Sequence, residues 1–387
     1  MTETLILATR GSDLALRQAE IVRDALATRQ REVDIRRVET RGDQIPDELI
    51  HRLGRTGAFV RALDEEVLAG DADLAVHSMK DVPTESSDDS EALHASGSRA
   101  SPDDLVVAGV PERGASGDLL VHPEGKPLAD LQSGAVVGTG SLRRTAQIKA
   151  VRPDLVVEPI RGNVDTRIEK LLAPGLQAEH ERRLTASGEA RAATAAEGEG
   201  DVVAESDETF ERSVEEWFDS LSDLERSAME RRVEDEYDAL VLAEAGLRRS
   251  KLFHEVGTTR LAREEFVPAA GQGAIAVTAV DDEVVEAVRS AVDHPRTRVA
   301  TTVERTVLAE LNGGCIAPIG VSALVQGEHV HVRARVLSTD GTDEVSGTRD
   351  LPIRSHATTA ASFAADLADR GAAELIADAR EEVDADV

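Results

Sequence analysis

The one cysteine of this chain, Cys315, stands in a glycine-rich loop that suits a thiol which a ligand must reach. The loop covers residues 312–320 and follows a predicted helix at 298–311. Two glycines before the cysteine relieve the Cβ restriction on the backbone, and Pro318 stiffens the chain after it. Two interpretations stay open, a reactive sulfur or a small buried apolar side chain, because no histidine stands nearby in the sequence to activate a thiol.

Arginine and hydroxyl side chains gather at two junctions between a predicted strand and a predicted helix. The junctions are residues 9–12, with Arg10 and Ser12, and residues 138–144, with Thr139, Ser141, Arg143 and Arg144. Helix N-termini attract anions, and guanidinium groups bind carboxylates through paired donors. Ligands of open α/β sheets lie beyond the carboxyl ends of the strands. The junctions therefore predict an anion site, and the plainer alternative is ordinary serine caps beside solvated arginines.

Three further arginines follow the same pattern. Arg161, next to Gly162, ends a predicted strand, Arg167 follows in the next helix, and Arg249 comes soon after the strand at 237–243. In a chain with a formal net charge of −30, an anion must be drawn to a local positive cleft or it is repelled. The alternative is that each arginine is a surface counter-charge.

The segment His77-Ser78-Met79-Lys80-Asp81-Val82-Pro83 also ends a predicted strand. Ser78 and Lys80 are suited to an anionic group, and Asp81 to accepting hydrogen bonds from a nitrogen at a reacting centre or to giving it a proton. The alternatives are a local ion pair between Lys80 and Asp81 and a structural role for His77. The ten histidines show no metal-ligand spacing, so we expect no metal.

Composition narrows the class of protein. A chain of 387 residues predicts two or three domains, and it has no apolar run long enough for a membrane span or a signal peptide. One cysteine suits a reducing, cytoplasmic location. Only five of the 44 basic residues are lysines, and together with the acidic charge this resembles proteins of salt-saturated cytoplasm. The charge also argues against nucleic acid and anionic membranes as partners.

Periodicity predicts an α/β pattern, with a probable parallel sheet, followed by a different C-terminal part. The first part has predicted strands at 5–8, 32–38 and 73–76 and helices at 12–28 and 59–68, and a linker is predicted at 85–104. The second has strands at 135–138, 155–160 and 237–243 and helices at 141–151 and 164–172. The third has the helix at 298–311, antiparallel strands at 321–324, 330–337 and 347–351 with a hairpin turn at Asp340-Gly341, and a final helix at 357–382.

An acidic segment at 176–234 interrupts the second part. It holds 17 acidic and 7 basic residues, a net charge of −10. Its first half has a disordered composition, and its second half places apolar residues from Phe210 to Ala228 at helical spacing. We interpret it as an insertion whose amphipathic helix packs on a neighbour, with a partner-docking role as the less favoured alternative.

Six segments, taken in order, resemble the hydroxymethylbilane synthases, also called porphobilinogen deaminases, a family of tetrapyrrole-biosynthesis enzymes. The segments are residues 8–12 (Ala-Thr-Arg-Gly-Ser), 77–83, 138–144 (Gly-Thr-Gly-Ser-Leu-Arg-Arg), 161–164 (Arg-Gly-Asn-Val), 269–273 (Ala-Ala-Gly-Gln-Gly) and 311–315 (Leu-Asn-Gly-Gly-Cys). They cover nearly the whole chain apart from the insertion, and the composition points to a member from a halophilic microbe.

The resemblance implies an α/β fold of three domains. Two of them resemble periplasmic binding proteins, and the third is a smaller α+β domain with an antiparallel sheet that carries the cysteine. The expected ranges are 1–96 with 273–290, 102–268 with the insertion at 176–234, and 296–387.

The resemblance also implies the chemistry. Cys315 would carry one dipyrromethane cofactor through a thioether, and four porphobilinogens would be added head to tail with loss of ammonia before hydrolysis releases hydroxymethylbilane. Asp81 would be catalytic, stabilising a positive azafulvene-like intermediate. The cofactor would contact Ser78, Lys80, Asp81, Thr139, Ser141, Arg143, Arg144, Arg161, Gly162 and Gln272, and the substrate Arg10, Ser12, Arg143, Arg161, Arg167 and Arg249. The family suggests a monomer.

The chain departs from the family pattern in two places, and two alternative functions stay open. The insertion has no counterpart in the family pattern, and residues 101–104 read Ser-Pro-Asp-Asp where the family tends to have Asp-Pro-Arg-Asp. A cytoplasmic anion-binding sensor would explain the arginines but would leave the cysteine loop unused. A non-catalytic homologue is the other rival, although every motif residue with a chemical role is present.

Overall fold

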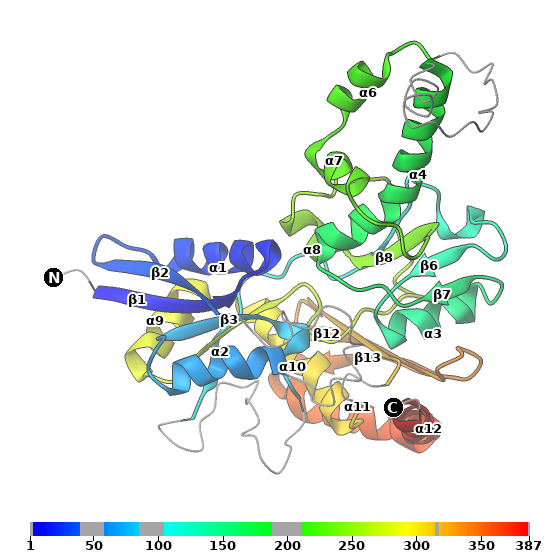
Figure 1. The fold of residues 1–387 in the computed structure, drawn as a ribbon. Coiled ribbons are helices and arrows are strands. Elements are labelled where there is room, and N and C mark those ends of the chain that lie inside the picture. Colours follow the sequence, from blue (N-terminus) through cyan, green and yellow to red (C-terminus); the bar gives the residue numbers. More distant parts are fainter. Residues whose placement is uncertain (1–2, 39–57, 85–103, 188–209, 314–316, 386–387) are drawn as a thin grey trace.

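The computed structural model describes residues 3–38, 58–84, 104–187, 210–313 and 317–385. Its strands form two five-stranded mixed sheets with helices on their faces and one three-stranded antiparallel sheet, so the predicted fold class is confirmed (Figure 1). In this part of the chain no helix is both long enough and apolar enough to cross a membrane.

The first sheet has the strand order β2-β1-β3-β10-β4. Its strands are β1 (Glu3–Arg10), β2 (Arg31–Val38), β3 (Leu74–Ser78), β4 (Val106–Gly109) and β10 (Ile275–Ala279), and its helices are α1 (Asp13–Leu26), α2 (Ala58–Leu68) and α9 (Asp282–Val292). β1, β2 and β3 are parallel as predicted, but β10 returns from far along the sequence and pairs antiparallel with β3 and β4. α1 and α9 share an apolar core on one face, and α2 covers the other.

The second sheet repeats this plan with the order β7-β6-β8-β5-β9. Its strands are β5 (Asp118–Val121), β6 (Val136–Gly138), β7 (Val156–Glu158), β8 (Ala239–Ala243) and β9 (Thr258–Arg260), and its helices are α3 (Leu142–Val151), α4 (Val164–Ser187) and α8 (Glu244–Arg249). β6, β7 and β8 are parallel, and β5 is antiparallel to β8 and β9. The chain passes between the sheets twice, through a first crossover (residues 110–117) and a second crossover (residues 261–274).

The C-terminal unit packs helices against the antiparallel sheet. It contains β11 (Ile319–Gln326), β12 (His329–Leu337) and β13 (Glu344–Pro352), with α10 (Pro295–Glu310), α11 (His356–Leu367) and α12 (Ala373–Ala385). Gly341 has a positive φ in the predicted hairpin turn. The single final helix that we predicted is wrong, because Gly371, at φ 104°, breaks it between α11 and α12.

The insertion differs from its prediction in two ways. α4 does not end at 172 but continues through Pro174 to Ser187, and it leads away from the second sheet toward α6 (Figure 1). The single amphipathic helix at 210–228 is wrong: the structure has α6 (Val214–Ser220) and α7 (Asp223–Met229). Ser222 forms a second capping box, which starts a new helix. The first half of the insertion lies largely outside the described residues.

The domain boundaries stay a prediction. β4 lies in the first sheet although its residues follow the expected boundary at 102, so the first crossover begins only at residue 110. Nearly all of the predicted linker at 85–104 lies outside the described residues. The strands β4 and β5 are short, and periodicity did not reveal them.

Candidate functional site

The junction after β1 has the predicted cap. Ser12 Oγ accepts a hydrogen bond from the backbone N–H of Ala15 at 3.3 Å and begins α1. Arg10 is the last residue of β1 and is partly exposed. The first turn of α1 packs against the second unit, because a Cβ on Gly246 of α8 would lie 3.8 Å from Leu14. The carboxyl end of the first sheet therefore faces the second unit.

The segment after β3 forms a short 3₁₀ turn, Met79–Asp81. Met79 N donates to the carbonyl oxygen of Ala274 at 3.0 Å, and the side chains of Lys80 and Asp81 are exposed. The ion pairs between described residues do not include one between Lys80 and Asp81. His77 is buried and lies 2.9 Å from Asp64 and 3.1 Å from Thr278, which fits the structural role considered for it. The two charged groups of this turn are thus presented to solvent.

The junction after β6 uses its hydroxyls differently from the first one. Thr139 is buried and accepts a hydrogen bond from the backbone N–H of Ser141 at 3.3 Å. Ser141 stands at the N-cap of α3 but its side chain makes no capping hydrogen bond. A hydroxyl at a helix N-terminus that is not used as a cap suits a hydrogen bond to an anionic ligand.

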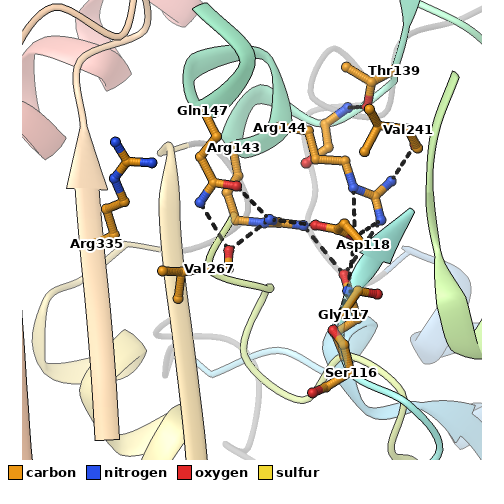
Figure 2. Close-up of polar contacts among 12 residues, drawn as sticks. Ser116, Gly117, Asp118, Thr139, Arg143, Arg144, Gln147, Val241, Val267 and Arg335 are labelled. Atoms are coloured by element: carbon orange, nitrogen blue, oxygen red, sulfur yellow. Dashed lines mark hydrogen bonds and ion pairs between the residues drawn. The ribbon is translucent and has the colours of Figure 1, made fainter. Parts of the chain in front are cut away.

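The two arginines that follow converge on an acid that the sequence analysis missed (Figure 2). Arg143 Nη1 lies 2.9 Å from Asp118 Oδ2, and Arg144 Nη2 lies 2.7 Å from Asp118 Oδ1. All three side chains are buried. Arg143 also donates to Gln147 and to the carbonyl oxygen of Val267. We expected the pair to offer free donors, but in this arrangement much of their hydrogen-bonding capacity serves the protein.

The charge of Asp118 is stabilised despite its burial. Desolvation raises the pKa of this carboxyl, but the charges and hydrogen bonds of Arg143 and Arg144 outweigh it and lower the pKa to about 2. An acid that opens a short apolar strand, Asp-Leu-Leu-Val, was the available sequence signal for Asp118. Burial of a lone carboxylate is so costly that such a residue requires cationic partners.

Gln272 joins this network to the second crossover. Its Nε2 donates to the carbonyl oxygen of Ser116 at 2.6 Å and to Asp118 Oδ1 at 3.0 Å, and its Oε1 accepts from Arg143 at 3.3 Å. Gly271 and Gly273 beside it have φ values of 73° and 83°, which glycine adopts without strain. Gln272 therefore lies beside Arg143 and Arg144, and it also links the two crossovers.

A second group of arginines lies at the carboxyl ends of β6 and β7. Burial, together with the charges of Arg144 and Arg161, lowers the pKa of Arg167 to about 10. Arg167 Nε donates to the carbonyl oxygen of Gly162, which has a φ of 110°. The charges of Arg144 and Arg161 therefore disfavour that of Arg167, and an anion placed among the three side chains would relieve this repulsion.

Arg249 stands apart from this group, beside the crossovers. Its Nη2 donates to the carbonyl oxygen of Gly273 at 2.7 Å, and burial lowers its pKa. A Cβ on Gly114 would lie 3.2 Å from the same nitrogen. Arg249 thus lies where the two units are joined.

The cysteine loop is described only at its base, and Cys315 itself lies outside the described residues. Asn312 has a φ of 51°, and a Cβ on Gly313 would lie 2.1 Å from Ile319. Arg380 of α12 donates to the carbonyl oxygen of Asn312, and Ala317 N donates to Gly313 O at 3.4 Å. The two ends of the loop therefore lie side by side on the C-terminal unit. Among the described residues no group of three or more His, Cys, Asp or Glu side chains could hold a metal ion.

Comparisons with known proteins give matches along most of the chain. The family described as porphobilinogen deaminase, dipyromethane cofactor binding domain, matches residues 5–180 and 225–287, and its C-terminal domain matches residues 299–370. The gap between the first two ranges falls within the predicted insertion.

Full-length relatives carry the same name. A probable porphobilinogen deaminase of Halobacterium salinarum is 52% identical over 98% of this chain and 99% of its own length. The porphobilinogen deaminase of Sulfurimonas denitrificans is 32% identical over 96% of both. The ectoine-binding protein of the TeaABC TRAP transporter aligns over 99% of both chains with a TM-score of 0.34 and 9% identity.

Proposed function

The chain belongs to the porphobilinogen deaminase family, and from this premise we propose that the arginines at the ends of its two sheets bind the carboxylates of a dipyrromethane held by Cys315. Porphobilinogen deaminase activity, a transferase reaction of tetrapyrrole biosynthesis, follows from the family, and the family implies porphobilinogen as substrate. The proposal concerns which residues perform it.

The group of Arg144, Arg161 and Arg167 is the observation that carries the proposal. Burial, together with the charges of Arg144 and Arg161, lowers the pKa of Arg167 to about 10, so an anion placed among these three side chains would be favoured. The pyrrole ring of porphobilinogen bears an acetate and a propionate, so the two rings of a dipyrromethane bring four carboxylates. The donor set of guanidinium, ammonium and hydroxyl groups suits these carboxylates.

The residues then divide by role. When bound, the cofactor supplies a primer to which porphobilinogen units are joined with loss of ammonia. Ser78, Lys80, Thr139 and Ser141 would donate to its carboxylates, together with the guanidinium groups of Arg143, Arg144 and Arg161, while Gly162 and Gln272 would line the same site. Arg10, Ser12, Arg167 and Arg249 hold the acid side chains of incoming substrate, with Arg143 and Arg161 shared between both.

Asp81 is the proposed catalytic residue. Its exposed carboxylate lies on the turn beside the second crossover, where it accepts hydrogen bonds from pyrrole N–H groups. A carboxylate there stabilises the positive charge that develops beside the pyrrole nitrogen when ammonia leaves and takes the proton released at the carbon being joined. We propose that hydrolysis after four additions releases hydroxymethylbilane.

An intact-protein mass spectrum tests the proposal. The purified protein is expected to exceed its sequence mass by one dipyrromethane and to give a colour with an aldehyde reagent for pyrroles. The Cys315→Ser variant is expected to show neither and to make no bilane. Undiminished bilane production by that variant would overturn the proposal. A wild-type mass that never increases with porphobilinogen would favour the anion-binding sensor.

A further inference from the structure

Arg305 of α10 is buried against the segment that carries the proposed catalytic residue. This segment, residues 79–83, is called the Asp81 turn below. Its Nη1 donates to the carbonyl oxygen of Val82 and its Nη2 to that of Pro83, both at 2.7 Å. These carbonyls come directly after Asp81 in the chain. Only 5% of Arg305 is exposed, so water does not share these hydrogen bonds to any large extent. The side chain therefore joins the C-terminal unit to the end of β3.

We infer that Arg305 is a positioning residue that fixes the Asp81 turn at a set distance from the end of α10 and the described base of the cysteine loop, Asn312 and Gly313. This inference rests on the proposed function, because it assigns to Arg305 the task of placing the proposed catalytic carboxylate. α10 carries Arg305 and ends at Glu310, shortly before the loop. The helix thus connects the two groups that must meet a single substrate.

The neighbouring residue on α10 holds the other side of the turn. Glu304 is fully buried and accepts hydrogen bonds from the backbone N–H of Gly271 at 2.7 Å and from Arg113 at 2.7 Å and 3.0 Å. A Cβ on Gly271 would lie 2.7 Å from Met79 Cγ and 3.2 Å from the backbone nitrogen of Lys80. The turn is therefore enclosed between the second crossover and Arg305, and both are fixed to α10.

A buried arginine is a costly way to fill this space. Burial lowers the pKa of Arg305 to about 10, and its Nε is buried without a hydrogen-bond partner among the described residues. An apolar side chain of similar size would pack without this cost. What the guanidinium adds is direction, because its planar donors fix two successive carbonyls in one geometry.

The test compares Arg305→Met and Arg305→Lys with Arg298→Met in the full-length holoenzyme. Arg298 lies on the same helix and donates to the carbonyl oxygens of Val107 and Ala108, but it does not touch the Asp81 turn. The rate of bilane formation, KM for porphobilinogen, cofactor content by mass and Tm are measured for each. A displacement of about 1 Å at a reacting group costs up to about 100-fold in rate.

For Arg305→Met we expect kcat to fall about 10- to 100-fold with KM nearly unchanged. Arg305→Lys, with one remaining donor to a carbonyl, is expected to recover part of the rate. Arg298→Met is expected to lower Tm and to keep kcat. If Arg305→Met does not fold, Arg305→Lys takes its place against the same control.

A double variant separates positioning from stability. If Arg305 acts through Asp81, adding Arg305→Met or Arg305→Lys to Asp81→Asn slows the enzyme no further. Multiplicative losses, or a kcat that falls no more than in Arg298→Met, would overturn the inference while leaving the proposed role of Asp81 intact. An Asp81→Asn variant with the normal rate would overturn both, and only in that case does the proposed catalytic role fail as well.

Discussion

The side-chain amide of Gln272 lies 3.0 Å from the carboxylate of Asp118, and this contact connects the second crossover to the first strand of the second sheet. Through Asp118 the same amide is linked to Arg143 and Arg144. The place where the two α/β units join is therefore also the place where two of the proposed cofactor ligands are held.

Replacing Gln272 by leucine is expected to destabilise the protein by about 1–3 kcal/mol, because the carbonyl oxygen of Ser116 and one oxygen of Asp118 lose a buried donor. Urea unfolding measures the change. Gln177→Leu is the matched control, since Gln177 donates to two carbonyl oxygens in the insertion, away from the crossovers. A larger loss in the control would contradict the importance assigned to the crossover contact.

Asp118→Asn should cost about 3–5 kcal/mol at neutral pH, because it leaves two buried arginines without their anion. The pKa of Asp118 is lowered to about 2, so its stabilising effect is complete above the unfolded value of about 3.9 and is lost as the pH falls through about 2. The stability difference between wild type and variant should therefore shrink between about pH 4 and pH 2.

The control for this measurement is Asp154→Asn. The pKa of Asp154 is also lowered to about 2, with its hydrogen bond to Arg152 as the main cause, but this carboxylate is exposed. A much smaller stability change is expected. Equal losses in the two variants would show that burial of Asp118 is not the decisive factor.

Asp81→Asn is expected to reduce kcat by at least about 100-fold and to leave Tm nearly unchanged. The side chain is exposed, so the fold does not depend on it, while an amide neither accepts a proton nor balances a positive charge. Steady-state kinetics measure the change in kcat, and a thermal melt measures the change in Tm. Normal turnover in this variant would rule out the catalytic assignment.

Arg167→Gln is expected to lower kcat/KM about 10- to 100-fold, the effect of losing a charge-assisted hydrogen bond to a carboxylate. Its pKa is lowered to about 10, which means that the folded protein disfavours the charge and that stability rises as the pH increases through about 10. At pH 7, therefore, the variant should be as stable as wild type or more stable. Arg182→Gln, on an exposed part of the same helix, is the control.

A rise in salt should stabilise the protein. With a net charge of −30, carboxylates repel one another, and the screening length shortens from about 10 Å at 0.1 M to about 3 Å at 1 M salt. Thermal melts in low and high KCl, with sucrose as a neutral control, are expected to show a higher Tm in KCl. A Tm that is independent of KCl would mean that repulsion within the acidic surface does not destabilise the protein at low salt.

Local patterns predicted the elements well where one signal dominates. The helix after Ser12 begins at the expected cap, and the strand predicted at 135–138 agrees with β6 within one residue. The helix at 210–228 failed because apolar spacing was read without the capping box at Ser222 and Glu225, which ends one helix and starts another. The break at Gly371 was equally visible as a glycine in a long helical run.

The sequence by itself determined the family of the protein, since the motif residues and their order are enough to define it, and it located the strand ends that carry the proposed site residues. Only the tertiary structure decided how those residues are held. Asp118, Glu304 and Arg305 act on residues far away in the chain, and several of their partners are backbone groups that every residue has. No pattern of side chains records such contacts, because burial and chain crossing alone bring them together.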